Sequence, residues 1–160
     1  MRPRLARAFV GGLLGTAVIT LSMYFVSPVV TGGPTDIAAM LGEALRASWI
    51  AGMIAHFAVG ALVLPGIYVL VLYRFLLGGP VVRGMMFGTI LWLITQVVVM
   101  PVMGGGLFSE QAGGLDAVLG SLIGQLAYGL VVGTFAGGRR SLEVHHLDDF
   151  ELETRVRRAG

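Results

Sequence analysis

Four long apolar runs, separated by short polar stretches, dominate this chain. They cover about residues 8–30, 49–73, 84–103 and 115–136, and the one Asp, Glu, Lys or Arg in them is Asp116, at the start of the fourth run. Roughly 20 apolar residues in a helix cross the hydrocarbon core of a bilayer, which is about 30 Å thick. The pattern therefore predicts an all-α membrane protein, a bundle of four transmembrane helices whose solvent is the lipid bilayer.

The polar stretches predict two further elements. After Pro34, Thr35 or Asp36 can cap a short helix, whose apolar residues recur at helical spacing. These apolar residues are Ile37, Met40, Leu41, Ala44 and Leu45. We expect this amphipathic helix of the first outer loop to lie on the membrane surface or to cover the bundle. Residues 139–160 form a charged tail, which we separate from a transmembrane domain at 1–138.

The arginines predict the orientation of the chain. The sequence has no lysine, and only Arg46 falls in the loops at about 31–48 and 104–114. Because cytoplasmic loops carry the excess of basic residues, we expect a multi-pass protein of the inner (plasma) membrane with both termini in the cytoplasm. The same arginines account for the pI near 9.5, so we expect no nucleic-acid partner.

Composition narrows the classes of function. The chain is 12% charged, about half of what a soluble domain carries. It has no cysteine, which excludes disulfides, thiolate catalysis and iron–sulfur clusters with cysteine ligands. We find no P-loop, nucleophile elbow or metalloprotease motif. The sequence therefore gives enzymatic catalysis no support, and we assign no catalytic residue and no metal site.

The sequence contains an internal duplication. Residues 11–33 align without gaps with residues 84–106, and 54–60 align with 123–129. The bundle should thus consist of two repeated helical hairpins related by a pseudo-two-fold axis along the membrane normal. His56 and Gln125 then occupy equivalent places. Glycines four residues apart indicate close helix packing; these are Gly11, Gly15, Gly84, Gly88, Gly120, Gly124, Gly129 and Gly133.

A few polar side chains lie inside the apolar runs at similar depth. His56 is the one ionisable side chain well inside a run besides tyrosine, and Gln96, Gln125 and Ser22 lie near its level. Polar groups avoid lipid, so we expect them to face inward and to bond one another in one layer. Such a layer either sets the helix register or forms a site for haem b, a metal, a quinone or a proton path. For haem, His56 and Met23 are the candidate ligands.

The chain resembles an uncharacterised family of small bacterial four-helix membrane proteins, filed under domains of unknown function. The resemblance covers about residues 10–137 and rests on four segments. They are Asp36–Gly42, Ile54–Gly60, Met100–Phe108 and Leu126–Gly129. Members of this family often have a second histidine where this chain has Gln125, so the resemblance argues against a bis-histidine site here. It implies a fold and no activity.

Our leading hypothesis is a non-catalytic accessory or assembly subunit of a larger bacterial membrane complex, with a respiratory complex as one candidate. Gly-rich faces, a covering helix and a charged tail suit contacts with other membrane subunits or self-association. Two alternatives remain open: an electron-transfer protein that binds b-haem or quinone through His56, and a small homo-oligomeric transporter or channel.

Overall fold

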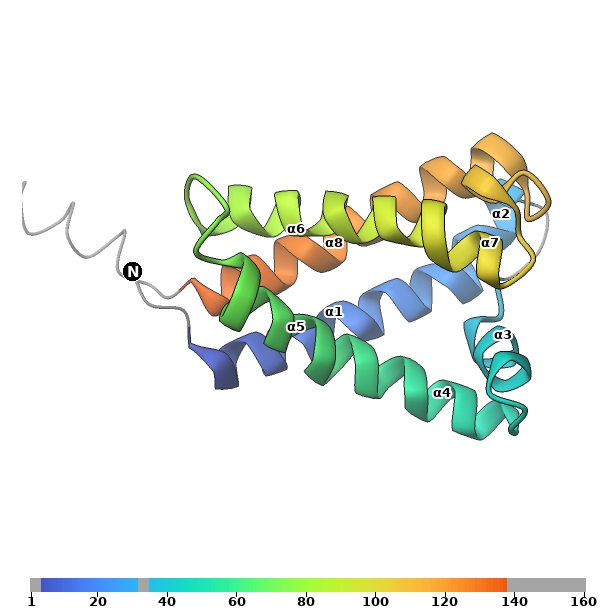
Figure 1. The fold of residues 1–160 in the computed structure, drawn as a ribbon, viewed down its shortest axis with the longest axis horizontal. Coiled ribbons are helices and arrows are strands. Elements are labelled where there is room, and N and C mark those ends of the chain that lie inside the picture. The colour runs from blue at the N-terminus through green and yellow to red at the C-terminus, as the bar shows by residue number, and fades with distance from the viewer. Residues whose placement is uncertain (1–3, 32–34, 138–160) are drawn as a thin grey trace, which may run out of the picture.

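The computed structural model describes residues 4–31 and 35–137, which form a bundle of long helices (Figure 1). The first is α1 (Leu5–Phe25), followed by the short α2 (Ser27–Thr31). The second runs through α4 (Trp49–Ala58), η1 (Val59–Val63), α5 (Leu64–Ile67) and η2 (Tyr68–Leu72). The third comprises α6 (Pro80–Ile94), η3 (Thr95–Val99) and α7 (Met100–Val102), and the fourth is α8 (Gly114–Ala136).

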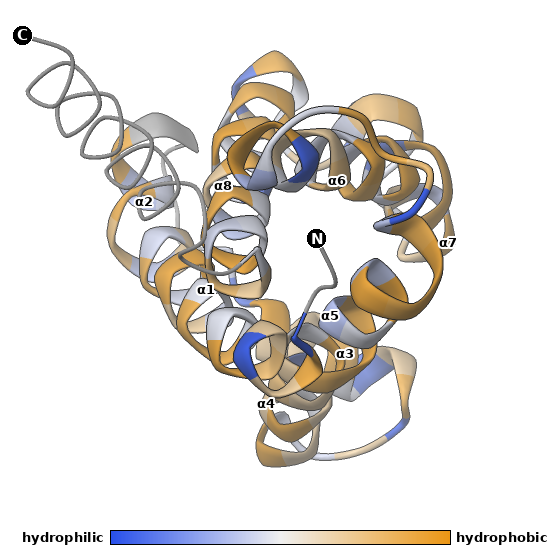
Figure 2. Cartoon of the chain, turned by 90° about the vertical axis from the view of Figure 1, so that its left-hand side faces the viewer, coloured by the Kyte–Doolittle hydropathy of each residue, from blue (hydrophilic) through white to orange (hydrophobic). Residues whose placement is uncertain are grey.

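Four helices are long and apolar enough to cross a membrane, and we call them the first to fourth spans. They are Leu5–Val29, Trp49–Leu72, Pro80–Val102 and Gly114–Ala136. The prediction of four spans is therefore confirmed, with small shifts at their ends. Hydrophobic residues run along all four spans (Figure 2). Large apolar side chains are exposed on the outside of the bundle, with Leu70 and Ile123 each 69% exposed. A protein dissolved in lipid is expected to expose apolar side chains in this way.

The spans are neighbours in the order second, first, fourth, third. The second span packs on α1, α1 packs on α8, and α8 packs on α6. The N–H of Arg4 donates to the carbonyl of Ala136 at 3.3 Å, so the two ends of the described bundle lie together. The predicted tail at 139–160 falls outside the described residues.

Two of the π-helical turns precede prolines inside spans. The η1 turn ends just before Leu64 and Pro65, and η3 ends just before Met100 and Pro101. Proline has no N–H, so the helix loses one i−4 hydrogen bond there. A wider π turn accommodates the lost bond and re-aims the side chains around it. Gln96 lies in η3, and His56 lies in α4, three residues before η1.

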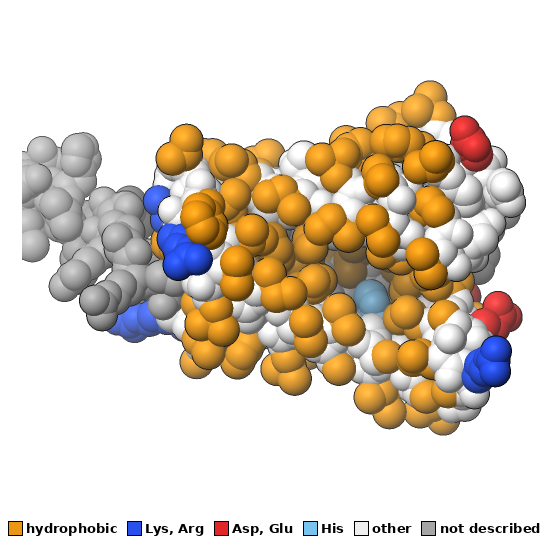
Figure 3. Space-filling model, in the orientation of Figure 1, with side chains coloured by type: hydrophobic (Ala, Val, Ile, Leu, Met, Phe, Trp, Pro, Cys, Tyr) orange, Lys and Arg blue, Asp and Glu red, His pale blue; other side chains and the backbone are white. Residues whose placement is uncertain are grey.

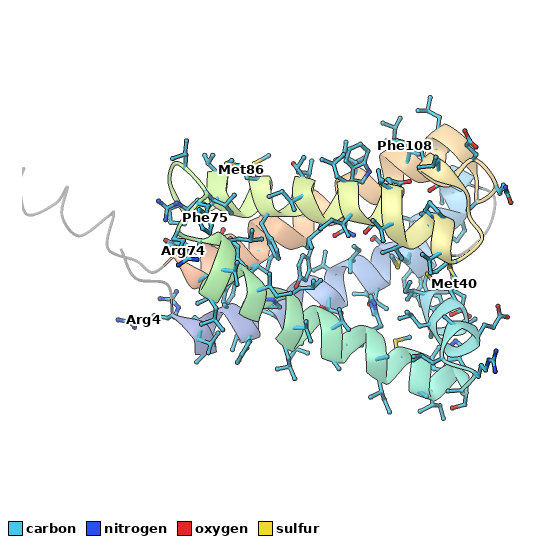
Figure 4. All side chains as sticks on the ribbon, in the orientation of Figure 1. Arg4, Met40, Arg74, Phe75, Met86 and Phe108 are labelled. Atoms are coloured by element: carbon cyan, nitrogen blue, oxygen red, sulfur yellow. The ribbon has the colours of Figure 1, made fainter. Side chains whose placement is uncertain are left out.

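The two ends of the bundle differ in charge (Figures 3 and 4). One end, the arginine end, holds Arg4 and Arg74, together with Arg7 and Arg83, which lie near the starts of α1 and α6. The opposite end, the loop end, holds α3 (Ile37–Ala44) and the 3₁₀ turn η4 (Leu107–Ser109). The described carboxylates all belong to the loop end; they are Asp36, Glu43, Glu110 and Asp116.

The predicted amphipathic helix of the first loop is α3, and it packs against α4. Its closest contact uses Ala38 and Gly42, both buried, rather than the larger apolar residues of the predicted face. A Cβ on Gly52 of α4 would stand 2.6 Å from the nitrogen of Gly42. The helices thus touch backbone to backbone, which only small residues permit, while Leu45 stays 56% exposed.

Candidate functional site

The second and third spans diverge toward the loop end. Near the arginine end they touch through Tyr68 and Phe87, whose ring centroids are 4.8 Å apart. Farther along, α4 and η1 pack on α1, and η3 follows α6 beside α8, with no comparable packing between the two pairs in the described chain. The surface is hollowed there, and the one described histidine, His56, is visible in the hollow (Figure 3). We call this hollow the lateral cleft.

His56 is held by the first span and keeps one ring nitrogen free. Its Nε2 lies 2.9 Å from Oγ1 of Thr20. The Thr20 hydroxyl donates its single hydrogen to the carbonyl of Thr16 at 2.7 Å, so His56 Nε2 is the donor in the first bond. In the neutral imidazole, Nδ1 is then an acceptor. It has no hydrogen-bond partner among the described residues.

Tyr128 of the fourth span is hydrogen-bonded to Gly60 of the second span, one helical turn after His56. Its hydroxyl donates to the carbonyl of Gly60 at 2.5 Å, and the side chain is 2% exposed. Gly60 belongs to the π turn η1. Because a π turn leaves a carbonyl without its i+4 partner, an external donor can use it. This bond holds η1, which begins three residues after His56, against the fourth span.

A second polar cluster lies between the third and fourth spans. Gln96 is 1% exposed; its Nε2 donates to Ser121 Oγ at 2.7 Å, and its Oε1 accepts from Ser109 Oγ at 2.9 Å. Gln125 Nε2 donates to Thr95 Oγ1 at 3.3 Å. Ser109 has a φ of 56°, in the left-handed region. The Gln96 cluster therefore anchors a strained loop to the bundle.

Comparison with known families places the chain in one of them. A family model described as a family of unknown function (DUF6789) matches residues 3–143. The chain belongs to this family. No curated protein and no solved structure matches the chain. The predicted resemblance to an uncharacterised family is thus confirmed. DUF6789 carries no assigned activity, so the function has to be argued from the geometry.

In this DUF6789 chain the predicted polar layer is divided between two hairpins. His56 bonds Thr20 in the first hairpin, whereas Gln96 and Gln125 bond partners in the second. Ser22 donates back to the carbonyl of Ile19 in its own helix at 2.8 Å. Our expectation of one layer of mutually bonded groups is therefore not what the structure shows, because His56, Gln96 and Gln125 each bond a hydroxyl within their own hairpin.

The hydroxyl partners were not predicted from the sequence. Thr20, Thr95, Ser109 and Ser121 complete the clusters, and their depths near His56 and Gln96 were the available signal. Met23, the second candidate haem ligand, lies three residues beyond Thr20 on α1. No group of three or more His, Cys, Asp or Glu residues gathers in the part of the chain that the structure describes.

Most of the predicted glycines make the closest helix contacts. A Cβ on Gly129 would stand 2.7 Å from the nitrogen of Gly88. Close approaches of this kind, to a backbone or to a side chain of a neighbouring helix, involve Gly11, Gly15, Gly84, Gly88, Gly129 and Gly133. Gly124 meets only the side chain of Ile19, at 3.2 Å. Gly120 is exposed with no atom within 4 Å, so the contact predicted for it is absent from the described bundle.

Asp36 forms a clasp at the loop end. Its carboxylate accepts from the Tyr24 hydroxyl at 2.7 Å, from Trp49 Nε1 at 3.0 and 3.1 Å, and from the N–H of Ala39 at 3.0 Å. It thereby caps α3, as predicted, and joins the first and second spans. The Tyr24 hydroxyl, followed by the Ala39 N–H, holds the pKa of Asp36 below its usual range.

Proposed function

We propose that this DUF6789 protein is an accessory or assembly subunit of a larger membrane complex, and that it docks a transmembrane helix of a partner subunit in the lateral cleft. A non-catalytic, helix-binding role fits the absence of catalytic motifs in the sequence.

The observation that supports this proposal is that the second and third spans do not pack along their whole length. The pseudo-two-fold relates the first and fourth spans to the third and second. Between the first and fourth spans, Gly11 and Gly15 press against Val132 and Tyr128. The equivalent interface between the second and third spans is joined at the arginine end by Tyr68 and opens into the lateral cleft. One of the bundle's helix–helix interfaces is thus available for another helix.

The chemistry of the cleft supports a helix as the occupant. An imidazole nitrogen without a donor in hydrocarbon carries a desolvation cost of about 1–3 kcal/mol on protein scales. A hydroxyl or amide of a partner helix would satisfy His56 Nδ1. Polar contacts of this kind, together with close van der Waals packing, associate helices in lipid. The partner helix we infer therefore carries a donor at the level of His56.

The orientation in the membrane is part of the proposal. Arg4, Arg7, Arg74 and Arg83 gather at one end of the bundle and Asp36 and Glu110 at the other. By the positive-inside rule, the arginine end and both termini lie in the cytoplasm and the loop end lies outside. The membrane is then the inner (plasma) membrane. A haem, quinone or transport role gains no support from Gln125, which is engaged with Thr95.

Native mass spectrometry of complexes extracted in mild detergent tests the docking. We expect the wild-type chain to retain a membrane partner and His56→Leu to lose it. His56→Gln, which keeps a side-chain acceptor, should retain at least part of it. Thr89→Val is the matched control, because the exposed Thr89 hydroxyl bonds only the carbonyl of Met85 in its own helix. A wild-type chain that is always recovered alone, or a partner unaffected by His56→Leu, would refute the proposal.

A further inference from the structure

Two buried polar atoms at the arginine end have no hydrogen-bond partner. They are the hydroxyl of Tyr68, whose side chain is fully buried, and Nε of Arg83. Both side chains contact the ring of Tyr73. The Arg83 guanidinium carbon lies 4.5 Å from the Tyr73 ring centroid, and the Tyr68 ring meets Tyr73 edge-on at 5.6 Å. Buried polar atoms without a hydrogen bond are rare, so we expect these two atoms to have a hydrogen-bond partner outside the described chain.

The charge around this pair is positive and is not neutralised by described residues. Arg4, Arg7, Arg74 and Arg83 lie at this end, whereas the described carboxylates lie at the loop end. Arg83 itself is half-buried between the second and third spans, with Tyr73 stacked beneath its guanidinium. The stacking holds the guanidinium at the edge of the apolar outer surface of the bundle.

We infer that Arg83 and Tyr68 bind the phosphate of an anionic phospholipid headgroup, which reaches the buried Tyr68 hydroxyl when the half-buried Arg83 side chain moves outward. A phosphate oxygen accepts hydrogen bonds from a guanidinium in a bidentate fork and from a phenolic hydroxyl. Basic pockets between transmembrane helices at this depth suit such headgroups. Phe75 and Leu77, which follow Tyr73 in the chain, are exposed and offer an apolar surface to the acyl chains. This site lies at the opposite end from the opening of the lateral cleft and does not depend on the docking role.

Thermal unfolding of the purified full-length protein in mixed micelles tests the site. Phosphatidylglycerol should raise the unfolding midpoint by ~4 °C over the same amount of phosphatidylcholine. Inorganic phosphate at the same concentration should not. If inorganic phosphate alone gives the full shift, or if the two lipids act alike, a headgroup site is refuted.

Variants separate specific binding from general charge. Tyr68→Phe removes only the unpaired hydroxyl, so it should keep the wild-type midpoint in phosphatidylcholine and lose most of the phosphatidylglycerol shift. Arg83→Gln should lose the shift as well. Arg74→Gln is the control, since exposed Arg74 lies over Phe75 at the same end. If Tyr68→Phe and Arg83→Gln keep the full shift, or if Arg74→Gln removes as much of it, the assignment fails. A buried water as the partner would give the first of these results.

Discussion

The contact between the third and fourth spans can be tested with a single methyl group. Gly129→Ala places a Cβ 2.7 Å from the nitrogen of Gly88 and 2.9 Å from its Cα, and closer still to the carbonyl oxygen of Gly84. Ordinary contacts begin near 3.4 Å, so α6 and α8 must separate by 3.4 − 2.7 = 0.7 Å or more. The obstacles are backbone atoms, which cannot rotate away. Overpacking of this kind costs about 1–3 kcal/mol, and we expect the upper half of that range.

The matched control lies on the same helix. Gly120→Ala is the same chemical change at a position with open space around it, so it should be neutral or stabilising by up to ~1 kcal/mol. Both variants can be compared by unfolding in mixed micelles with increasing fractions of a denaturing detergent, followed by tryptophan fluorescence. Equal stability of Gly129→Ala and Gly120→Ala would show that the close glycine contact does not hold these spans together.

Three further predictions concern polar contacts. The pKa of Asp36 is lowered in the folded chain, so the hydrogen bonds to its carboxylate should stabilise the fold above pH ~4, and this stabilisation should be lost as the pH falls through the lower folded pKa. Trp49 fluorescence should follow this loss in the wild type and not in Asp36→Asn. Gln96→Leu should destabilise by ~1–3 kcal/mol because buried Ser109 loses its partner, and proteolysis of the loop around Ser109 should accelerate. Tyr128→Phe should cost ~1 kcal/mol in the same unfolding assay, and an unchanged midpoint would count against the bond to η1.

Hydropathy and the internal repeat were enough to predict the spans, the hairpins and the helix of the first loop. They could not predict how each helix is rotated about its axis. Gly84 and Gly88 face α8 in the second hairpin, so the repeat predicts that Gly11 and Gly15 face the second span. Instead both face α8, and their neighbour Gly12 faces the second span, where a Cβ would stand 2.8 Å from the carbonyl oxygen of Gly60. A rotation of one residue thus distinguishes the two hairpins.

The candidate site shows the same limit. The depth of His56 and Gln96 follows from counting residues along a span, at ~1.5 Å each. The direction of Gln96, and the path of the second span beyond His56, depend on the π turns η3 and η1, which lie ahead of the prolines. Apolar sequences carry no periodic signal for such turns, since every face is hydrophobic. The lateral cleft was therefore invisible in the sequence, although the histidine that marks it was identified.

The hydrogen bond from Arg4 to Ala136 has a consequence for the history and engineering of the chain. The beginning of the first hairpin and the end of the second meet at the membrane side where Gly78 and Gly79 join the two hairpins. A linker from Ala136 to Arg4 could thus replace the link at Gly78 and Gly79. A circularly permuted gene that begins with the second hairpin, or two separate genes with one hairpin each, should assemble the same bundle.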